Sequence, residues 1–231
     1  MGTKIGMTLE SMITAETLSF MLNGALISLT IALCAFVVGI ALGIVGASMR
    51  ISKNKVLRAC GRIYVEVIRG TPMLLQILFL YLGFPAIYTM ITGGVIRLNP
   101  YVVGTVAISI NSGAYATELI RGGILSIDKG QWEAAKTLGM SNKLTMRKII
   151  LPQAFKIILP PLVSEFIVLI KDSCLISTIG GVELLQSAQI LGVQHYNYLP
   201  FLVAASIMYL IMTSVVSVIA GRVEKKVMSY D

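Results

Sequence analysis

The chain has 231 residues, of which 56% are hydrophobic and only 13% are charged, and its mean hydropathy is +0.84. A soluble domain of this length cannot hide so much apolar surface, so the composition excludes an ordinary globular protein and indicates a membrane protein. The long uncharged runs cover residues 17–49, 70–96, 98–117 and 196–221. Each run is close to or above the ~20 residues that a spanning helix needs. Because the runs are continuous rather than alternating, we predict an all-α integral membrane protein with about five spans and not a barrel.

The net charge of +8 comes from 19 Lys and Arg against 11 Asp and Glu, and the placement of the basic residues predicts the orientation. They gather at 50–69, 121–148 and 222–226, and the segments between these clusters are almost free of them. This is the positive-inside distribution, which places basic segments in the cytoplasm. We therefore predict a multi-pass protein of the plasma membrane with its N-terminus outside and its C-terminus in the cytoplasm. The positive charge does not indicate a nucleic-acid partner.

The first part of the chain predicts an external amphipathic lead-in over residues 1–17 and then a span over about 18–48. Gly39 and Gly43 in this span have the spacing at which two membrane helices approach closely. We expect them to pack against a neighbouring helix rather than to bind a ligand.

The second predicted span covers about 57–82 and contains Arg69, whose side chain can reach back to the cytoplasmic interface. Thr71 and Pro72 follow it closely. Two interpretations of Arg69 and Thr71 stay open. They form a helix kink with local capping, or they contact a transported solute.

The third predicted span covers about 98–118 and begins at Pro100 after an external loop. It carries Asn111 and Ser112 deep in the membrane. Buried polar side chains of this kind bond neighbouring helices or line a path for a solute, and both interpretations stay open.

A charged, helix-forming segment follows over about 119–152, and it is too polar to cross a bilayer. Asp128 and Gln131 have the spacing of a capping box, and Gly139 is a suitable helix stop. Ser141 can cap a second short helix that ends at Leu151-Pro152. The segment therefore predicts a helix, a glycine turn and a second helix at the membrane surface. It is either a docking element for a partner or a surface hairpin without one.

The fourth predicted span covers about 155–176 and contains Pro160-Pro161, where a kink or a helix start is expected. Glu165 lies in its middle third, where a carboxylate is costly unless it faces a polar cavity or a partner. Asp172 lies seven residues later on the same helix face, near the external end. These two acids are candidates for lining a solute path. For Glu165 a bond to a neighbouring helix or a second subunit is the alternative.

The rest of the chain predicts an external or shallowly re-entrant helix over 173–195 and a fifth span over about 198–220. No second domain or linker is apparent. The sequence lacks a glycine-rich phosphate loop ending in Gly-Lys-Ser or Gly-Lys-Thr, so we expect no ATP site in this chain. The cysteines and the single histidine have no metal-binding spacing, so we expect no metal or other cofactor: they are Cys34, Cys60, Cys174 and His195.

The segment over 119–152 contains a spaced set of residues: Glu133, Ala134, Ala135, Gly139, Ile149, Leu151 and Pro152. With this spacing it resembles the signature loop of bacterial ABC-importer permease subunits. Residues 64–72 also resemble a stretch typical of the polar-amino-acid branch, which takes up histidine, glutamine, arginine or cystine. The resemblance covers about residues 17–222 and is consistent with a single permease domain over 1–231, of the type I importer architecture.

The resemblance implies a bacterial inner-membrane subunit that hydrolyses no ATP itself. Its partners would be a cytoplasmic ATPase dimer that holds ATP and Mg, an extracytoplasmic solute-binding protein and a second permease copy, identical or closely related. The matching loop residues would form the coupling helix that docks on the ATPase. The mechanism would be alternating access for a polar amino acid, and Glu165 would suit a basic one.

Three other classes remain to be compared with this interpretation. A permease for another small polar solute fits the same residues. A passive channel or scaffold subunit explains the spans and Glu165 but leaves the spaced loop without a purpose. A membrane enzyme would need paired acids or a nucleophile with a base, and His195 stands alone.

Overall fold

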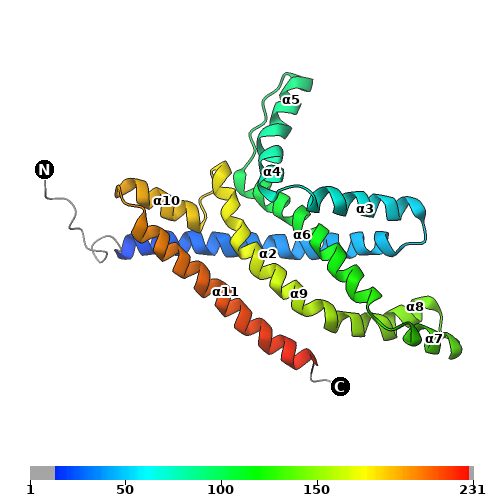
Figure 1. Cartoon of the computed structure of the whole chain (residues 1–231). Coiled ribbons are helices and arrows are strands. Elements are labelled where there is room, and N and C mark those ends of the chain that lie inside the picture. The colour runs from blue at the N-terminus through cyan, green and yellow to red at the C-terminus, as the bar shows by residue number, and fades with distance from the viewer. Residues whose placement is uncertain (1–13, 229–231) are drawn as a thin grey trace, which may run out of the picture. The chain divides into compact units, whose positions relative to one another are not determined.

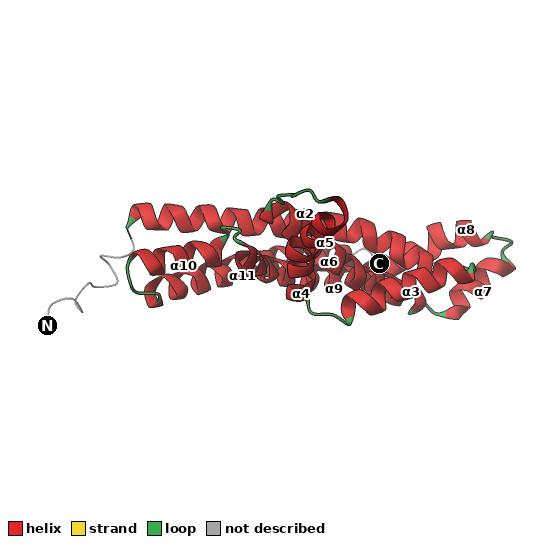
Figure 2. Ribbon diagram, turned by 90° about the horizontal axis from the view of Figure 1, so that it is seen from above, coloured by secondary structure: helices red, strands yellow, loops and turns green. Residues whose placement is uncertain are grey.

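The computed structural model describes residues 14–228, with side chains to residue 226, and is drawn in Figures 1 and 2. Within this range every regular element is helical, so the predicted all-α class is confirmed. Most of the expected lead-in over 1–17 lies outside the described residues. The α-helices are α2 (Ala15–Ile51), α3 (Lys55–Arg69), α4 (Met73–Leu78), α5 (Phe84–Thr92), α6 (Pro100–Leu125), α7 (Lys129–Thr137), α8 (Asn142–Thr145), α9 (Leu151–Asp172), α10 (Leu184–Gln194) and α11 (Leu199–Met228).

Two π-helical turns and one 3-10 helix complete the described elements. The π-helical turns are Phe79–Gly83, between α4 and α5, and Met146–Ile150, between α8 and α9. The 3-10 helix, Ser173–Ile179, continues α9. Each π-helical turn is continuous with the α-helix on either side, so the helical backbone runs unbroken through it.

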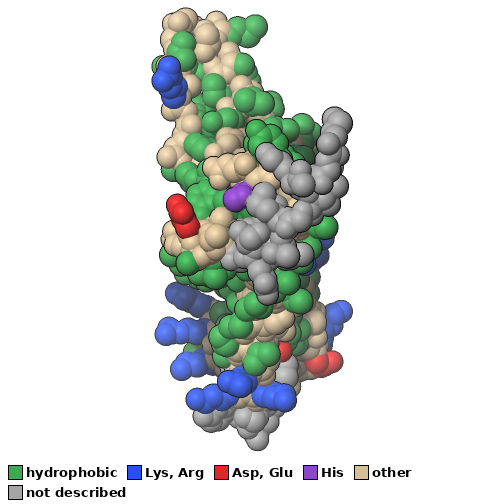
Figure 3. Space-filling view, turned by 90° about the vertical axis from the view of Figure 1, so that its left-hand side faces the viewer, with side chains coloured by type: hydrophobic (Ala, Val, Ile, Leu, Met, Phe, Trp, Pro, Cys, Tyr) green, Lys and Arg blue, Asp and Glu red, His purple; other side chains and the backbone are tan. Residues whose placement is uncertain are grey.

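Hydrophobic side chains remain exposed over much of the surface, as the green areas of Figure 3 show. Within the described range, the helices long and apolar enough to cross a membrane are the segments Ala15–Ile51, Met73–Thr92, Asn142–Ile179 and Leu199–Lys226. Helix α6 has 26 residues and is not among them, because polar residues in its middle and the charged Glu118 and Arg121 in its last third lower its hydropathy. The expected count of about five spans therefore stays a prediction.

The chain divides into two compact units, and α2, α6, α9 and α11 each contribute to both. Unit 1 comprises residues 14–35, 73–108 and 168–215 of the described range. In its core, α10 lies along the first part of α2 and along α11, where Met21, Leu184 and Phe201 are fully buried.

Unit 2 comprises residues 36–72, 109–167 and 216–228 of the described range. Its core joins the end of α6 to the beginning of α9 through Ile124, Ile150 and Ile158. A Cβ atom on Gly39 would lie 2.7 Å from Ser112 Oγ, and one on Gly43 would lie 2.5 Å from Ala116 Cβ. The prediction that these two glycines serve helix packing is confirmed.

The second predicted span differs from the structure. In place of one helix over 57–82, the chain forms α3, turns at residues 70–72, and starts again at Met73. The basic residues of α3 and the Gly70-Thr71-Pro72 sequence explain the break, because proline cannot donate the next helical hydrogen bond. The structure also continues past the expected end at Gly83-Phe84-Pro85, with Pro85 in the first turn of α5.

The fourth helix also begins earlier than the sequence indicates. The expected stop at Leu151-Pro152 is wrong, since the helix runs on from Asn142 to Ile179. The Leu151 N–H donates to the Met146 carbonyl five residues back, and this wider turn accommodates Pro152. Pro160 and Pro161 lie inside α9, so no helix begins there.

Candidate functional site

The candidate site is the helix–turn–helix segment between α6 and α9, which we call the coupling segment and which comprises residues 126–152. Asp128 caps α7, because its Oδ1 accepts a hydrogen bond from the Gly130 N–H at 2.6 Å. The second hydrogen bond of the expected capping box, from the Asp128 N–H to the Gln131 side chain, is replaced by another contact: the Gln131 side-chain Oε1 accepts from Gln153 Nε2 at 3.5 Å. The N-terminal end of α7 is thus fixed both locally and to α9.

The turn at Gly139 closes α7 with two backbone hydrogen bonds. The Met140 N–H donates to the Ala135 carbonyl at 3.0 Å, and the Gly139 N–H donates to the Lys136 carbonyl at 2.9 Å. This is the Schellman arrangement, which needs a left-handed residue, and Gly139 has φ +72°. The predicted stop at Gly139 is confirmed.

The second helix of the segment starts at a serine cap. The Leu144 N–H donates to Ser141 Oγ at 3.4 Å, and the Thr145 hydroxyl donates to the Ser141 carbonyl at 3.1 Å. Thr145 is buried, and α7 and α8 contact each other (Figures 1 and 2). The two short helices therefore form one packed element rather than a loose loop.

The coupling segment has a buried face and an exposed face. Ala135 is 1% exposed and Ile150 is fully buried against α6 and α9. Glu133 and Ala134 are exposed, and Leu138 is 79% exposed at the C-terminal end of α7. An exposed leucine next to the exposed Glu133 and Ala134 is suited to contact with another protein.

The sequence analysis did not identify Leu138 as an exposed residue of this face. Its position directly before the helix stop at Gly139 could have indicated that it is exposed. Of the remaining predicted coupling residues, Ile149 is partly buried in the unit 2 core, while Leu151 and Pro152 are exposed on the first turn of α9. The seven signature residues are thus divided between the exposed face of α7 (Glu133 and Ala134), its buried face (Ala135), the turn (Gly139) and the base of the segment.

A charge cluster fixes the end of α6, just before the coupling segment. Arg50 Nε lies 3.1 Å from Glu118 Oε1, and Arg121 Nη2 lies 2.8 Å from Glu118 Oε2. A Cβ on Gly61 would meet the stem of Arg50 at 3.2 Å, so α3 packs against the same arginine. Glu118 therefore ties α2 to α6 where α3 also makes contact.

The structure buries the polar pair that was predicted in α6. Ser112 is 1% exposed and faces Gly39, and Asn111 is 5% exposed. The Tyr64 hydroxyl donates to the carbonyl of Ile110, the residue before Asn111, at 2.7 Å. In the described chain these groups lie between helices, and their role as a solute path stays a prediction.

The other predicted pathway residues lie at separate places. Glu165 and Asp172 are partly buried on α9. Arg69 is exposed and its guanidinium lies 4.8 Å from the centre of the Tyr115 ring. The Thr71 hydroxyl donates to the Val67 carbonyl at 2.9 Å, which is the local capping that one interpretation expected.

Unit 1 contains a buried carboxylate for which the sequence suggested no role. Glu183 is fully buried, and its Oε1 and Oε2 accept from the backbone N–H groups of Gln186 and Leu185 at 2.8 and 2.9 Å. The hydroxyls of Ser28 and Tyr209 donate to Oε2 at 3.2 and 2.6 Å. Glu183 thus joins α2, α10 and α11.

No three His, Cys, Asp or Glu side chains of residues 14–226 are gathered so as to hold a metal ion. The His195 ring packs against Phe201, with ring centres 5.2 Å apart, and the three cysteines are free thiols. The geometry of the described chain thus supplies an exposed helix face that ends at Leu138, and buried polar contacts between helices.

Comparison with known proteins gives consistent results. Residues 39–229 match the family model described as binding-protein-dependent transport system inner membrane component. The chain is 40% identical over 208 residues to the putative glutamine transport system permease protein GlnP of Rickettsia typhi, which covers 90% of this chain and 92% of that protein. It is 36% identical over 225 residues to the arginine transport system permease protein ArtQ of Bacillus subtilis, covering 97% and 100%.

Solved structures show the same fold. The crystal structure of an amino acid ABC transporter with histidines contains a chain that is 35% identical, with a TM-score of 0.87, covering 96% of this chain and 100% of that one. A chain of the inward-facing MetNI methionine ABC transporter is 18% identical with a TM-score of 0.76, covering 93% and 99%. At that identity the second likeness concerns the fold alone.

Proposed function

This chain belongs to the family of binding-protein-dependent transport system inner membrane components, and we propose that it is the permease subunit of an ATP-driven amino-acid importer. The similar permeases carry the names of glutamine and arginine transport systems, and a third, TcyB of Bacillus subtilis, is named for L-cystine. A polar amino acid is the class that these names share. We propose that this chain carries a member of that class across a bacterial plasma membrane.

The observation that carries the proposal is the coupling segment. Its helix α7 is capped at Asp128, closed at Gly139 and anchored by the buried Ala135, while Glu133 and Leu138 point to the exterior. A short helix held at both ends transmits force as a rigid body, whereas a loose loop would absorb it. We propose that this exposed face docks on a cytoplasmic ATPase dimer, which binds ATP and Mg.

The proposed cycle is alternating access. When ATP closes the ATPase pair, the coupling segment moves with it and the spans of two permease copies open outward to receive a solute from an extracytoplasmic binding protein. Hydrolysis reverses the motion. The Arg50–Glu118 contact connects the end of α6, just before the coupling segment, to α2. The movement of the coupling segment would pass to the spans through this contact.

The Glu165 carboxylate supports a polar amino acid with a positively charged group as the solute. It lies within α9, one turn after Pro161, where a carboxylate meets an ammonium or guanidinium group favourably. Because every amino acid has an α-ammonium group, glutamine and cystine also satisfy this contact. Glu165 therefore supports the class and favours arginine, lysine or histidine within it.

The deciding experiment is reconstitution of this chain with its ATPase and binding protein in vesicles. The ATPase rate and the uptake of labelled amino acids are measured across the polar amino acids. Stimulation of both by one amino acid is the expected result. Stimulation only by a solute of another class would overturn the substrate proposal, and uptake that continues without ATP would overturn the importer proposal in favour of a passive channel.

A further inference from the structure

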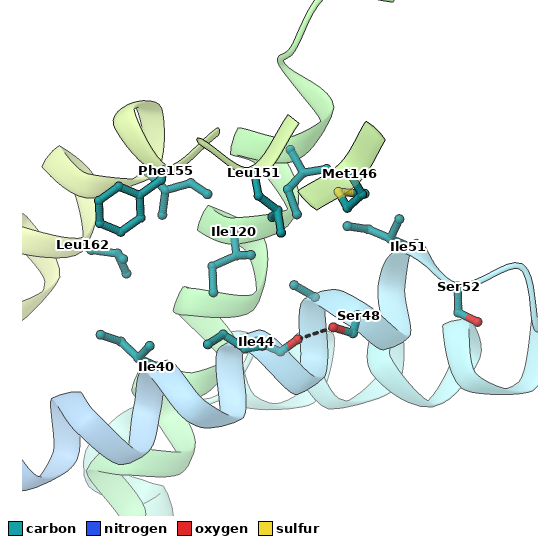
Figure 4. Close-up of a pocket in the computed structure, with 13 residues that line it drawn as sticks. Ile40, Ile44, Ser48, Ile51, Ser52, Ile120, Met146, Leu151, Phe155 and Leu162 are labelled. Carbon is teal, nitrogen blue, oxygen red and sulfur yellow. Dashed lines mark hydrogen bonds between the residues drawn. The ribbon is translucent and has the colours of Figure 1, made fainter. Parts of the chain in front are cut away.

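Unit 2 contains an apolar groove of about 640 Å³ between α2, α6 and the helix that runs from α8 into α9. Figure 4 shows Ile40, Ile44 and Ile51 on one wall and Leu151 and Phe155 on the opposite wall. We call this feature the inner groove. It is open rather than filled, because Ile44 is 53% exposed, Leu151 is 43% exposed and Phe155 is 53% exposed.

The polar groups along the inner groove offer little to a polar ligand. Ser48 and Ser52 are the hydroxyl residues among its lining side chains. The Ser48 hydroxyl donates to the Ile44 carbonyl at 2.7 Å, the dashed contact of Figure 4. An occupant of this groove must therefore be apolar along most of its length.

The length of the inner groove corresponds to one membrane leaflet. Ile40 and Ile51 are eleven residues apart on α2, which is about 17 Å along a helix axis. Half of a bilayer's hydrocarbon core is about 15 Å thick. A lipid acyl chain that lies along α2 would thus be covered from the leaflet surface to near the midplane.

Basic residues directly follow two of the lining residues at one end of the inner groove. Lys53 directly follows the lining residue Ser52, and Arg147 directly follows the lining residue Met146. Both cations are exposed, whereas Arg50 and Arg121 are engaged by Glu118. An apolar channel with exposed positive charge at one end is complementary to an acyl chain with a negative headgroup.

We propose that the inner groove binds one acyl chain of an anionic phospholipid of the cytoplasmic leaflet, with Lys53 and Arg147 facing its phosphate. The proposal rests on the proposed orientation of the chain in the membrane. A second copy of this chain would cover the same apolar wall but would leave the charge at its end unexplained. The π-helical turn contributes to the site, since it brings Met146 and Leu151, five residues apart, onto the same wall.

The test uses the full chain in phosphatidylcholine vesicles with a trace of photoreactive lipid, whose acyl chain carries a diazirine. One probe is a phosphatidylglycerol and the other a phosphatidylcholine. Labelled peptides are identified by mass spectrometry. The expected result is labelling of the peptides around 40–52 and 146–162, about fivefold or more stronger with the anionic probe.

Two sets of variants sharpen the test. Ile44→Trp fills the inner groove and should remove the labelling, while Val37→Trp, at an exposed position of α2 that does not line the groove, should leave it unchanged. The double change Lys53→Gln with Arg147→Gln should make the two probes label equally. Equal labelling by both probes in the unsubstituted chain, or labelling that survives Ile44→Trp, would overturn the proposal.

A photo-cross-link between two chains at groove residues would also overturn it, by showing that a second copy is the occupant. No transport is measured in this experiment. Failure of the amino-acid import proposal would therefore leave the expected lipid labelling intact, and failure of the lipid proposal would leave import intact.

Discussion

The hydroxyl of Tyr209 lies 2.6 Å from Oε2 of Glu183, and the carboxylate that receives it is fully buried. The same oxygen accepts from Ser28, so α2, from the beginning of the chain, meets α10 and α11 at one acid. A buried charge is tolerated when its acceptor sites are satisfied, and four hydrogen-bond donors satisfy this one.

Replacing the acid by its amide should destabilise unit 1. Glu183→Gln turns one acceptor oxygen into a donor that faces N–H or O–H groups, at a cost of about 2 kcal/mol. For a chain of this length the loss corresponds to roughly 4–8 °C in the thermal unfolding midpoint. Thermal unfolding in detergent measures it. Glu16→Gln, at an exposed position, is the matched control, and equal midpoints for the two variants would contradict the prediction.

The Gly139 turn should be needed for coupling rather than for insertion. Gly139→Val adds no clash, because nothing lies within 4 Å of its Cβ position, but it places a branched residue at φ +72°. The left-handed conformation then costs about 1–2 kcal/mol, so α7 loses its fixed end. The prediction is normal membrane insertion with reduced solute-stimulated ATPase activity and uptake in the reconstituted complex.

Two further changes separate backbone strain from bulk at that turn. Gly139→Asn should retain more activity than Gly139→Val, since asparagine tolerates the left-handed region. Gly122→Val, also in open space but within α6, should behave like the unsubstituted chain. If Gly122→Val uncouples the complex as strongly as Gly139→Val, the turn is not the cause.

The ion pair between Arg50 and Glu118 should contribute to stability. Arg50 and Glu118 have side chains that are 17% and 19% exposed, so their contact is only partly screened by water. A double-mutant cycle with Arg50→Met and Glu118→Gln should give a coupling of about 1 kcal/mol. Thermal unfolding of the four proteins provides the values. Simple addition of the two single effects would show that the contact contributes nothing.

Changing Glu165 should affect the solute and not the docking on the ATPase. Glu165→Gln keeps the size and removes the charge, so uptake of arginine or lysine should fall by about tenfold, equivalent to ~1.4 kcal/mol, and glutamine uptake should fall less. Competition among labelled amino acids in the reconstituted complex measures the difference. Glu66→Gln, exposed on α3, is the control. A profile identical to that of the control would assign Glu165 a structural role.

The features that sequence reasoning predicted well are local. Asp128, Gly139 and Ser141 act through hydrogen bonds to residues within five positions, so spacing alone reveals them. The packing role of Gly39 and Gly43 follows in the same way from a four-residue period.

The features that it missed depend on distant partners or on a change of helical period. Glu183 bonds Ser28, which is 155 positions away, and no local pattern indicates such a contact. Glu118 likewise meets Arg50 from another helix. The π-helical turn at Met146–Ile150 carried the helix past Pro152, and a reading with one fixed period places a stop there instead.

The extra residue in that π-helical turn has a consequence for how such chains vary in length. Removing one residue between Met146 and Ile150 would restore the α-helical period and rotate the preceding helix by about 100° relative to α9. The exposed surface of the segment before it would then point in another direction, although none of its own residues had changed. A single-codon deletion or insertion at this point is therefore a mutational route for realigning one protein with another, independent of the residues that form the contact.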